Sequence, residues 1–136
     1  MRFLIYFIAC ALCFSGCKKK VEDVKEDLLV KLIVDGQWAV TKYTKGTADV
    51  TADFSPYSFQ FKKDFTVDAV NNNAIENTGT WNGDIGTRTI VSNFPNPNPI
   101  LILLNGTWHV TDSGLTYVES SQTINGENCF LRLVKK

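Results

Sequence analysis

The sequence has no excess of charge of either sign and no long basic run. Its 136 residues contain 14 Lys and Arg against 14 Asp and Glu, and the longest basic run is Lys18-Lys19-Lys20. A surface without a basic patch does not attract the phosphate backbone of a nucleic acid. We therefore expect no nucleic-acid partner, and the length predicts one small domain at most.

The sequence also lacks the residue clusters that metal sites need. Its one histidine is His109, and no Cys/His cluster surrounds it, whereas a zinc site requires three or four ligands. Asp49, Asp53 and Asp84 fall in expected loops but outside any calcium-loop pattern. We expect no metal and no cofactor. Because His109 follows Trp108 directly, it is predicted to lie on the opposite face of its strand.

No catalytic motif is present. The Gly-x-Ser-x-Gly elbow and the glycine-rich phosphate loop are both absent. A Cys–His dyad would need His109 to meet Cys129, and a carboxylate pair would have to come from Asp64, Asp68, Asp84 or Glu119. The spacing of these acids is that of solvated strand positions. The protein is predicted to be non-catalytic, and an envelope hydrolase remains an alternative that requires such groups to converge in one pocket.

The first seventeen residues resemble a bacterial lipoprotein signal. Met1-Arg2 gives a positive start, and residues 3–14 form an apolar run that is too short for the roughly 20 residues that span a bilayer. Ser15-Gly16 then places small residues directly before Cys17. The resemblance implies lipidation of Cys17, a membrane anchor and a place in the cell envelope, at the outer membrane. An ordinary secretory signal with an incidental cysteine is the alternative.

Removal of this leader leaves one cysteine that is not committed to lipid. Cys10 and Cys13 belong to the leader, so only Cys129 remains and no intramolecular disulfide can form in the mature domain. Cys129 alternates with Leu131 and Leu133, which predicts a small buried core residue rather than a reactive thiol.

A helix is predicted before the main domain. Residues 18–27 are almost all charged or polar and are expected to form a tether and the start of this helix. Val21, Val24 and Leu28 recur at helical spacing, and Asp35-Gly36 provides a stop. The helix is expected to pack on the domain as a lid or tether, with binding to a partner as the alternative.

From residue 37 the apolar pattern changes to a two-residue period, which is typical of half-buried strands. Asn105-Gly106 and Asn125-Gly126 each predict a tight hairpin turn, because both residue types tolerate positive φ. Polar loops are expected at 71–73 and 93–99. The nine expected strands are 38–43, 57–61, 65–69, 77–81, 88–94, 100–104, 107–112, 115–121 and 129–134.

Short strands joined locally predict an antiparallel meander that closes on itself. The expected fold class is therefore all-β, a small up-and-down β-barrel of about eight or nine strands that occupies residues 28–136 with the short helix before it.

All three tryptophans follow a glycine by two residues, at Trp38, Trp81 and Trp108. The first instance, which follows a short helix and opens the first strand, resembles the Gly-x-Trp signature of the lipocalin (calycin) superfamily, and residues 28–136 resemble small lipocalin-like lipoproteins of Bacteroidota. The resemblance implies a structural barrel floor made by Gly36 and Trp38, with Arg132 stacked over Trp38 as a cation–π partner.

Aromatic residues are abundant, and a barrel mouth lined by them is a reasonable site for a small apolar or amphipathic ligand. The candidate lining residues are Tyr43, Tyr57, Phe59, Phe61 and Tyr117. The first functional hypothesis is an envelope barrel that binds such a ligand. The second is a structural or assembly lipoprotein with a filled barrel that docks another envelope protein, and exposure of the apolar run at 100–104 would favour this second hypothesis.

Overall fold

The computed structural model describes residues 16–136, with side chains from Lys25 onward. The predicted leader therefore lies outside the described residues, except for the backbone of Gly16 and Cys17, which begins the first helix. The elements are α1 (Gly16–Val34), β1 (Trp38–Lys45), β2 (Ala48–Asp49), η1 (Thr51–Phe54), β3 (Tyr57–Phe61), β4 (Thr66–Asn71), β5 (Ala74–Asp84), β6 (Thr89–Asn93), η2 (Leu101–Leu104), β7 (Gly106–Ser113), β8 (Tyr117–Ile124) and β9 (Glu127–Lys135).

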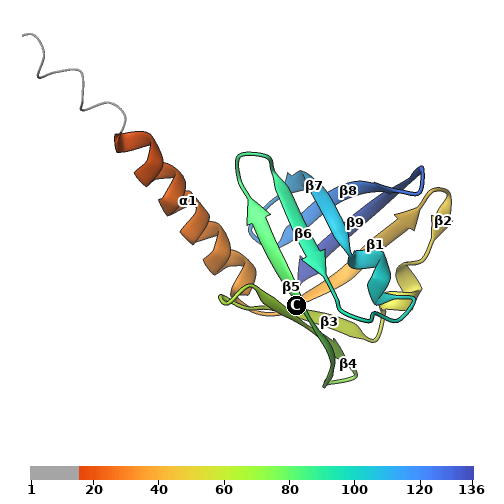
Figure 1. Cartoon of the computed structure of the whole chain (residues 1–136). Coiled ribbons are helices and arrows are strands. Elements are labelled where there is room, and N and C mark those ends of the chain that lie inside the picture. The colour runs from red at the N-terminus through yellow and green to blue at the C-terminus, as the bar shows by residue number, and fades with distance from the viewer. Residues whose placement is uncertain (1–15) are drawn as a thin grey trace, which may run out of the picture.

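Eight of the strands form a closed antiparallel barrel (Figure 1). Strands β3 to β8 each pair with the next strand in the chain, and β1 pairs with both β3 and β9 to close the ring. The β1–β3 joint is a single residue pair, Trp38 with Phe59, whereas β1 and β9 pair along their whole length. Strand β2 pairs only with β1 and lies outside the ring. The predicted all-β barrel is confirmed.

Strand alternation decides which side chains fill the barrel. On β9, Cys129 and Leu131 are buried while Phe130 is only half-buried, as a two-residue period requires. Strand β1 departs from this period because a bulge lies between Val40 and Lys42. The extra residue turns Tyr43 inward, where it is fully buried.

The two predicted Asn-Gly turns have different outcomes. Asn125 and Gly126 have φ values of 50° and 80° and join β8 to β9 in a tight turn, as predicted. Asn105 instead has φ −70° and ψ 146°, so no hairpin forms there and that prediction is wrong. The Asn105 side chain accepts a hydrogen bond from the Phe94 N–H at 2.7 Å and donates to the Phe94 carbonyl oxygen at 3.2 Å. These bonds hold the link between η2 and β7 against the end of β6.

The expected strand at 100–104 is a 3-10 helix, so that prediction is also wrong. The carboxamide oxygen of Asn98 accepts hydrogen bonds from the backbone N–H groups of Ile100 and Leu101 at 3.0 and 2.8 Å, which caps the helical turn. Leu101 and Leu104 are buried, and Ile102 is 52% exposed. The run is therefore mostly core, with one apolar side chain in solvent.

Both ends of the barrel are covered. The last turn of α1 places Ile33 against one end, while the rest of the helix projects away from the barrel (Figure 1). At the opposite end, η1 and η2 contribute the buried side chains of Phe54, Leu101 and Leu104. The Tyr43 hydroxyl reaches across from β1 and donates to the Leu103 carbonyl oxygen at 2.6 Å. Segments outside the ring of strands therefore cover both ends of the interior.

Candidate functional site

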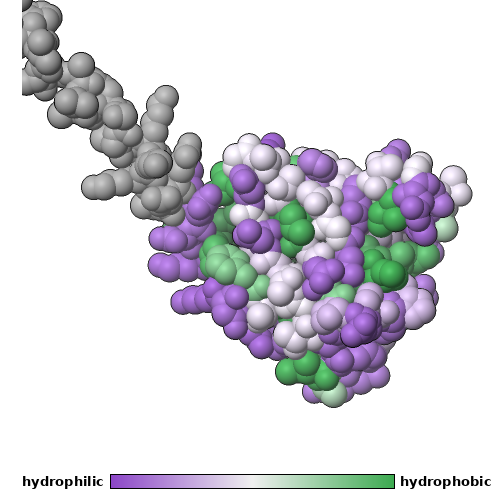
Figure 2. All heavy atoms as spheres, in the orientation of Figure 1, coloured by the Kyte–Doolittle hydropathy of each residue, from purple (hydrophilic) through white to green (hydrophobic). Residues whose placement is uncertain are grey.

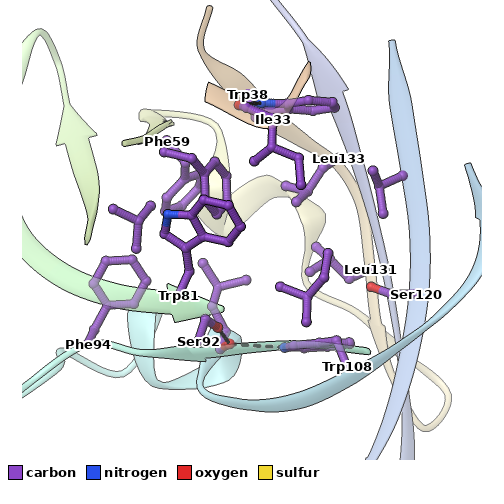
Figure 3. A pocket seen from close by; sticks show the side chains of 15 residues that line it. Ile33, Trp38, Phe59, Trp81, Ser92, Phe94, Trp108, Ser120, Leu131 and Leu133 are labelled. Atoms are coloured by element: carbon purple, nitrogen blue, oxygen red, sulfur yellow. Dashed lines mark hydrogen bonds between the residues drawn. The ribbon is translucent and has the colours of Figure 1, made fainter. Parts of the chain in front are cut away.

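The barrel encloses an apolar cavity of about 60 Å³ (Figure 3). Pockets that hold drug-sized ligands are about 300–1,000 Å³, and a dry apolar cavity of about 150 Å³ takes up benzene. The interior is therefore almost filled by side chains. The residues that line the cavity are Ile33, Trp38, Phe59, Phe61, Val67, Trp81, Ile90, Ser92, Phe94, Leu104, Trp108, Val118, Ser120, Leu131 and Leu133.

The three Gly-x-Trp tryptophans all line this cavity, and each is nearly fully buried. Their indole Nε1 groups donate hydrogen bonds to backbone carbonyl oxygens outside the ring of strands. Trp38 donates to Ile33 at 2.8 Å, Trp81 to Lys62 at 3.2 Å and Trp108 to Leu104 at 3.0 Å. Each tryptophan thus binds a covering segment to the barrel wall, because a buried indole N–H needs an acceptor.

The candidate ligand-lining residues fall into three environments. Phe59 and Phe61 line the cavity. Tyr43 and Tyr57 are buried in the core but do not line the cavity. The pKa of Tyr57 is raised, mainly by burial and to a smaller extent by the hydrogen bond that its hydroxyl donates to Glu76. Tyr117 lies outside the barrel, where Arg132 sits over its ring at 5.2 Å. The structure therefore places only two of the five on the wall of the cavity.

The expected stack of Arg132 over Trp38 is not formed. Arg132 lies between the inward residues Leu131 and Leu133, so strand alternation directs it outward, where its Nε bonds Glu119 at 3.2 Å. Lys135 has the inward register at the end of β9, and its Nζ lies 5.5 Å from the centre of the Trp38 ring. The cation at the barrel floor is thus Lys135. Gly36, with φ 78°, ends the helix just before Trp38.

The candidate acidic residues are occupied in structural contacts. Asp64 caps the turn before β4 by accepting from Thr66, and Asp84 accepts from the Thr87 N–H at 3.1 Å. Asp68 is 4% exposed and pairs with Lys62 at 2.7 Å. Burial alone would raise the pKa of Asp68, but hydrogen bonds from Lys62 and from Thr78 outweigh it and hold the pKa below its ordinary value.

Cys129 and His109 do not form a dyad. Strand β8 separates their strands, which places them about 10 Å apart at the usual strand spacing. Cys129 is buried and points inward, as predicted, whereas His109 is exposed on the outer face. The described part of the chain brings no three His, Cys, Asp or Glu side chains together in a group that could hold a metal ion. No helix within residues 16–136 is both long enough and apolar enough to cross a membrane.

A second hollow lies on the outside of the barrel, over β1, β7, β8 and β9, and it was not predicted. This outer groove has a volume of about 790 Å³. The location of the groove depends on the pairing register of four strands, that is, on which of their residues lie opposite one another. The sequence carried no signal for that register. The groove is lined by Thr44, Gly46, Thr107, His109, Ser121, Gln122, Thr123, Asn128, Cys129 and Phe130.

Comparison with solved structures shows a similar fold in a crystal structure described as a DUF4847 family protein from Bacteroides vulgatus ATCC 8482. The match covers 79% of this chain and 97% of that chain, with a TM-score of 0.55 and 17% sequence identity. At this identity the likeness supports the barrel fold alone. No protein-family model and no curated protein sequence matches the chain.

Proposed function

We propose that this chain is a lipid-anchored, non-catalytic protein of the cell envelope whose filled barrel serves as a structural or docking module rather than as a ligand carrier. The observation that carries the proposal is the interior: a cavity of about 60 Å³, covered by α1 at one end and by η1 and η2 at the other. Such a barrel is a rigid body whose remaining binding surface is its outside.

The anchor part of the proposal rests on the sequence before the barrel. An apolar run, the small residues Ser15-Gly16 and then Cys17 match a lipoprotein signal, and Lys18–Lys20 follow directly. A lipid chain together with basic residues gives stable attachment to an anionic membrane surface. The helix that follows projects from the barrel and would connect the anchor to it. The resemblance to small lipocalin-like lipoproteins, and a place at the outer membrane, belong to the same proposal.

The outer surface suits docking better than membrane insertion. On the face in Figure 2, apolar residues occur in small separate patches among polar ones. The exposed large apolar side chains of the barrel are Phe65, Ile75, Val91, Ile102 and Leu115, which come from different elements. Scattered single apolar residues are normal for a soluble surface.

Two measurements test the proposal. Growth of the host with labelled palmitate should label the wild-type chain and leave Cys17→Ser unlabelled. Titration of the chain with an apolar fluorescent probe should give no saturable uptake, because the cavity is too small for the probe. Label on Cys17→Ser would remove the anchor from the proposal.

The apolar lining of the cavity favours a second candidate, in which α1 moves aside and the barrel takes up a small apolar ligand. Ser120 lines the cavity, so the larger side chain in Ser120→Leu would occupy the space that a ligand needs. Saturable probe uptake by the wild type that Ser120→Leu abolishes would replace the first candidate with this one. A substitution with the same added bulk at an exposed position between η1 and β3, Ser55→Leu, is the matched control.

A further inference from the structure

The structure contains a binding site that neither the sequence nor the proposed function assigns: the outer groove over β1, β7, β8 and β9. We propose that this groove binds a neutral oligosaccharide. The inference goes beyond the proposed function, because the groove is separate from the interior cavity and does not depend on the anchor at Cys17.

Strand register brings the polar side chains of the groove together. Thr44 lies opposite Phe130, Phe130 opposite Ser121 and Ser121 opposite His109, so one row crosses four strands on the outer face. Opposite side chains in such a ladder are about 5 Å apart, which makes the row a continuous surface about 15 Å wide. Thr107, Thr123 and Asn128 extend it toward the end covered by η2.

No Lys, Arg, Asp or Glu side chain is among the lining residues, although the Glu127 carboxylate lies beside Gly46 at one end of the groove. The next row on the same outer face is charged, with Lys42 opposite Arg132, Arg132 opposite Glu119 and Glu119 opposite Asp112. Both cations of that row are paired, Lys42 with Asp49 and Arg132 with Glu119. A groove without a lining cation has no selective attraction for phosphates or carboxylates, so nucleotides, acidic glycans and anionic headgroups are not its preferred ligands.

The polar groups in the groove have the same hydrogen-bonding properties as the hydroxyl groups of a sugar. Hydroxyl groups of Ser and Thr act as donors and as acceptors, as sugar hydroxyls do. Among the described residues, the side chains of Thr44, Ser121 and His109 have no hydrogen-bond partner, so a ligand can use them without breaking a bond. Thr123 and Asn128 are joined by one bond of 3.2 Å.

Phe130 supplies the apolar element. It is the one aromatic residue in the groove lining, and it is half-buried at the centre of the row. The C–H face of a pyranose ring packs on an aromatic face, while its hydroxyls reach the polar groups on either side. The volume of about 790 Å³ lies within the range of small-molecule sites and is open enough for several sugar units.

A peptide fits this surface less well than a sugar. Extended peptides gain most of their affinity by pairing with a free strand edge. Strands β7, β8 and β9 are each paired on both sides, and β1 pairs with β9 on one side and with β2 and β3 on the other, so no free edge lies beneath the groove. A lipid tail would meet Phe130 as the one large apolar side chain, with hydroxyl and amide side chains on either side of it.

The test is calorimetric titration of the full chain in micelles of a zwitterionic detergent that carries no sugar. The probes are maltohexaose, cellohexaose and N-acetylchitohexaose, with hexaglycine as the peptide of similar length. We expect saturable binding of at least one hexasaccharide, and Phe130→Ser should weaken it about tenfold. Ile75→Ser, which removes an exposed apolar side chain on β5, away from the strands of the groove, should leave the affinity within about twofold.

Circular dichroism checks that each variant folds, and Ser121→Arg offers a second change, because it places a charge and a long side chain in the groove. Binding that is lost in both groove variants supports the inference. Absence of binding to all three sugars at millimolar concentration would overturn it, and so would sugar binding that survives both changes. Binding of hexaglycine as tight as that of the sugars would assign the groove to peptides instead.

Discussion

The indole Nε1 of Trp38 donates a hydrogen bond to the carbonyl oxygen of Ile33 at 2.8 Å, and this bond joins the last turn of α1 to the first strand of the barrel. The Ile33 side chain is 6% exposed and lines the cavity beside Trp38. The helix end is therefore part of the core, although most of the helix projects from the barrel.

Ile33→Ala should lower the free energy of unfolding by about 2–4 kcal/mol, because the change enlarges the cavity and removes a buried side chain. Leu28→Ala on the same helix is the matched control. Leu28 is 60% exposed, so its loss should change stability by less than about 0.5 kcal/mol. Urea unfolding followed by tryptophan fluorescence measures both. Equal effects at the two positions would mean that the helix end does not cover the barrel.

Tyr43→Phe should cost about 1–2 kcal/mol, because it removes the hydroxyl that bonds the Leu103 carbonyl oxygen. Burial, with a smaller effect of the neighbouring Cys129, raises the pKa of Tyr43 far above its ordinary value of 10.0. A raised pKa stabilises the folded state below pH 10.0, and this contribution is lost as the pH rises above that value.

Thermal unfolding between pH 8 and pH 12 tests this linkage. The wild type should lose more stability above pH 10 than Tyr43→Phe does, so the difference between the two proteins should shrink as the pH rises. A constant difference across the whole range would contradict a buried, neutral Tyr43.

Asp68→Asn should destabilise the protein by about 1–3 kcal/mol at pH 7, because it leaves Lys62 without its charged partner near a buried site. The lowered pKa of Asp68 contributes stability above pH 3.8, and this contribution is lost as the pH falls through the folded-state pKa. The two proteins should therefore converge in stability below pH 3.8. Asp53→Asn, an exposed substitution of the same kind, should change little at any pH.

Gly79→Ala tests the close contact that the second Gly-x-Trp motif makes. A Cβ atom at Gly79 would lie 2.5 Å from the Asn93 carbonyl oxygen and 2.9 Å from the Phe94 ring, so β5 and β6 would have to separate. We expect a loss of about 1–3 kcal/mol. At Gly83 on the same strand the nearest atom would be 3.9 Å away. If Gly83→Ala costs as much in chemical denaturation as Gly79→Ala, the close approach at Gly79 is not the cause.

Local signals in the sequence predicted much of this fold. The two-residue period identified the strands that form the ring, and the Asn125-Gly126 turn has the two positive φ values that its residues favour. The helix ends as expected at Gly36. These features depend on residues that are neighbours in the chain, so the sequence alone carries them.

Features that depend on one extra residue or on distant partners were not predicted. A bulge lies between Val40 and Lys42 in β1, and no side-chain pattern announces such an insertion. The apolar run 100–104 suits a buried strand as well as a helical turn. Asn98-Pro99 directly before it is a helix-start signal that could have distinguished the two.

We propose that the barrel is filled and binds through its outer surface. Native mass spectrometry of the protein purified from its own host, followed by organic extraction, tests this claim most directly. We predict the mass of the lipid-anchored chain with no further small molecule in stoichiometric amount. A defined apolar compound that travels with the wild type and is absent from Ser120→Leu would contradict the claim and show that the interior is a binding site.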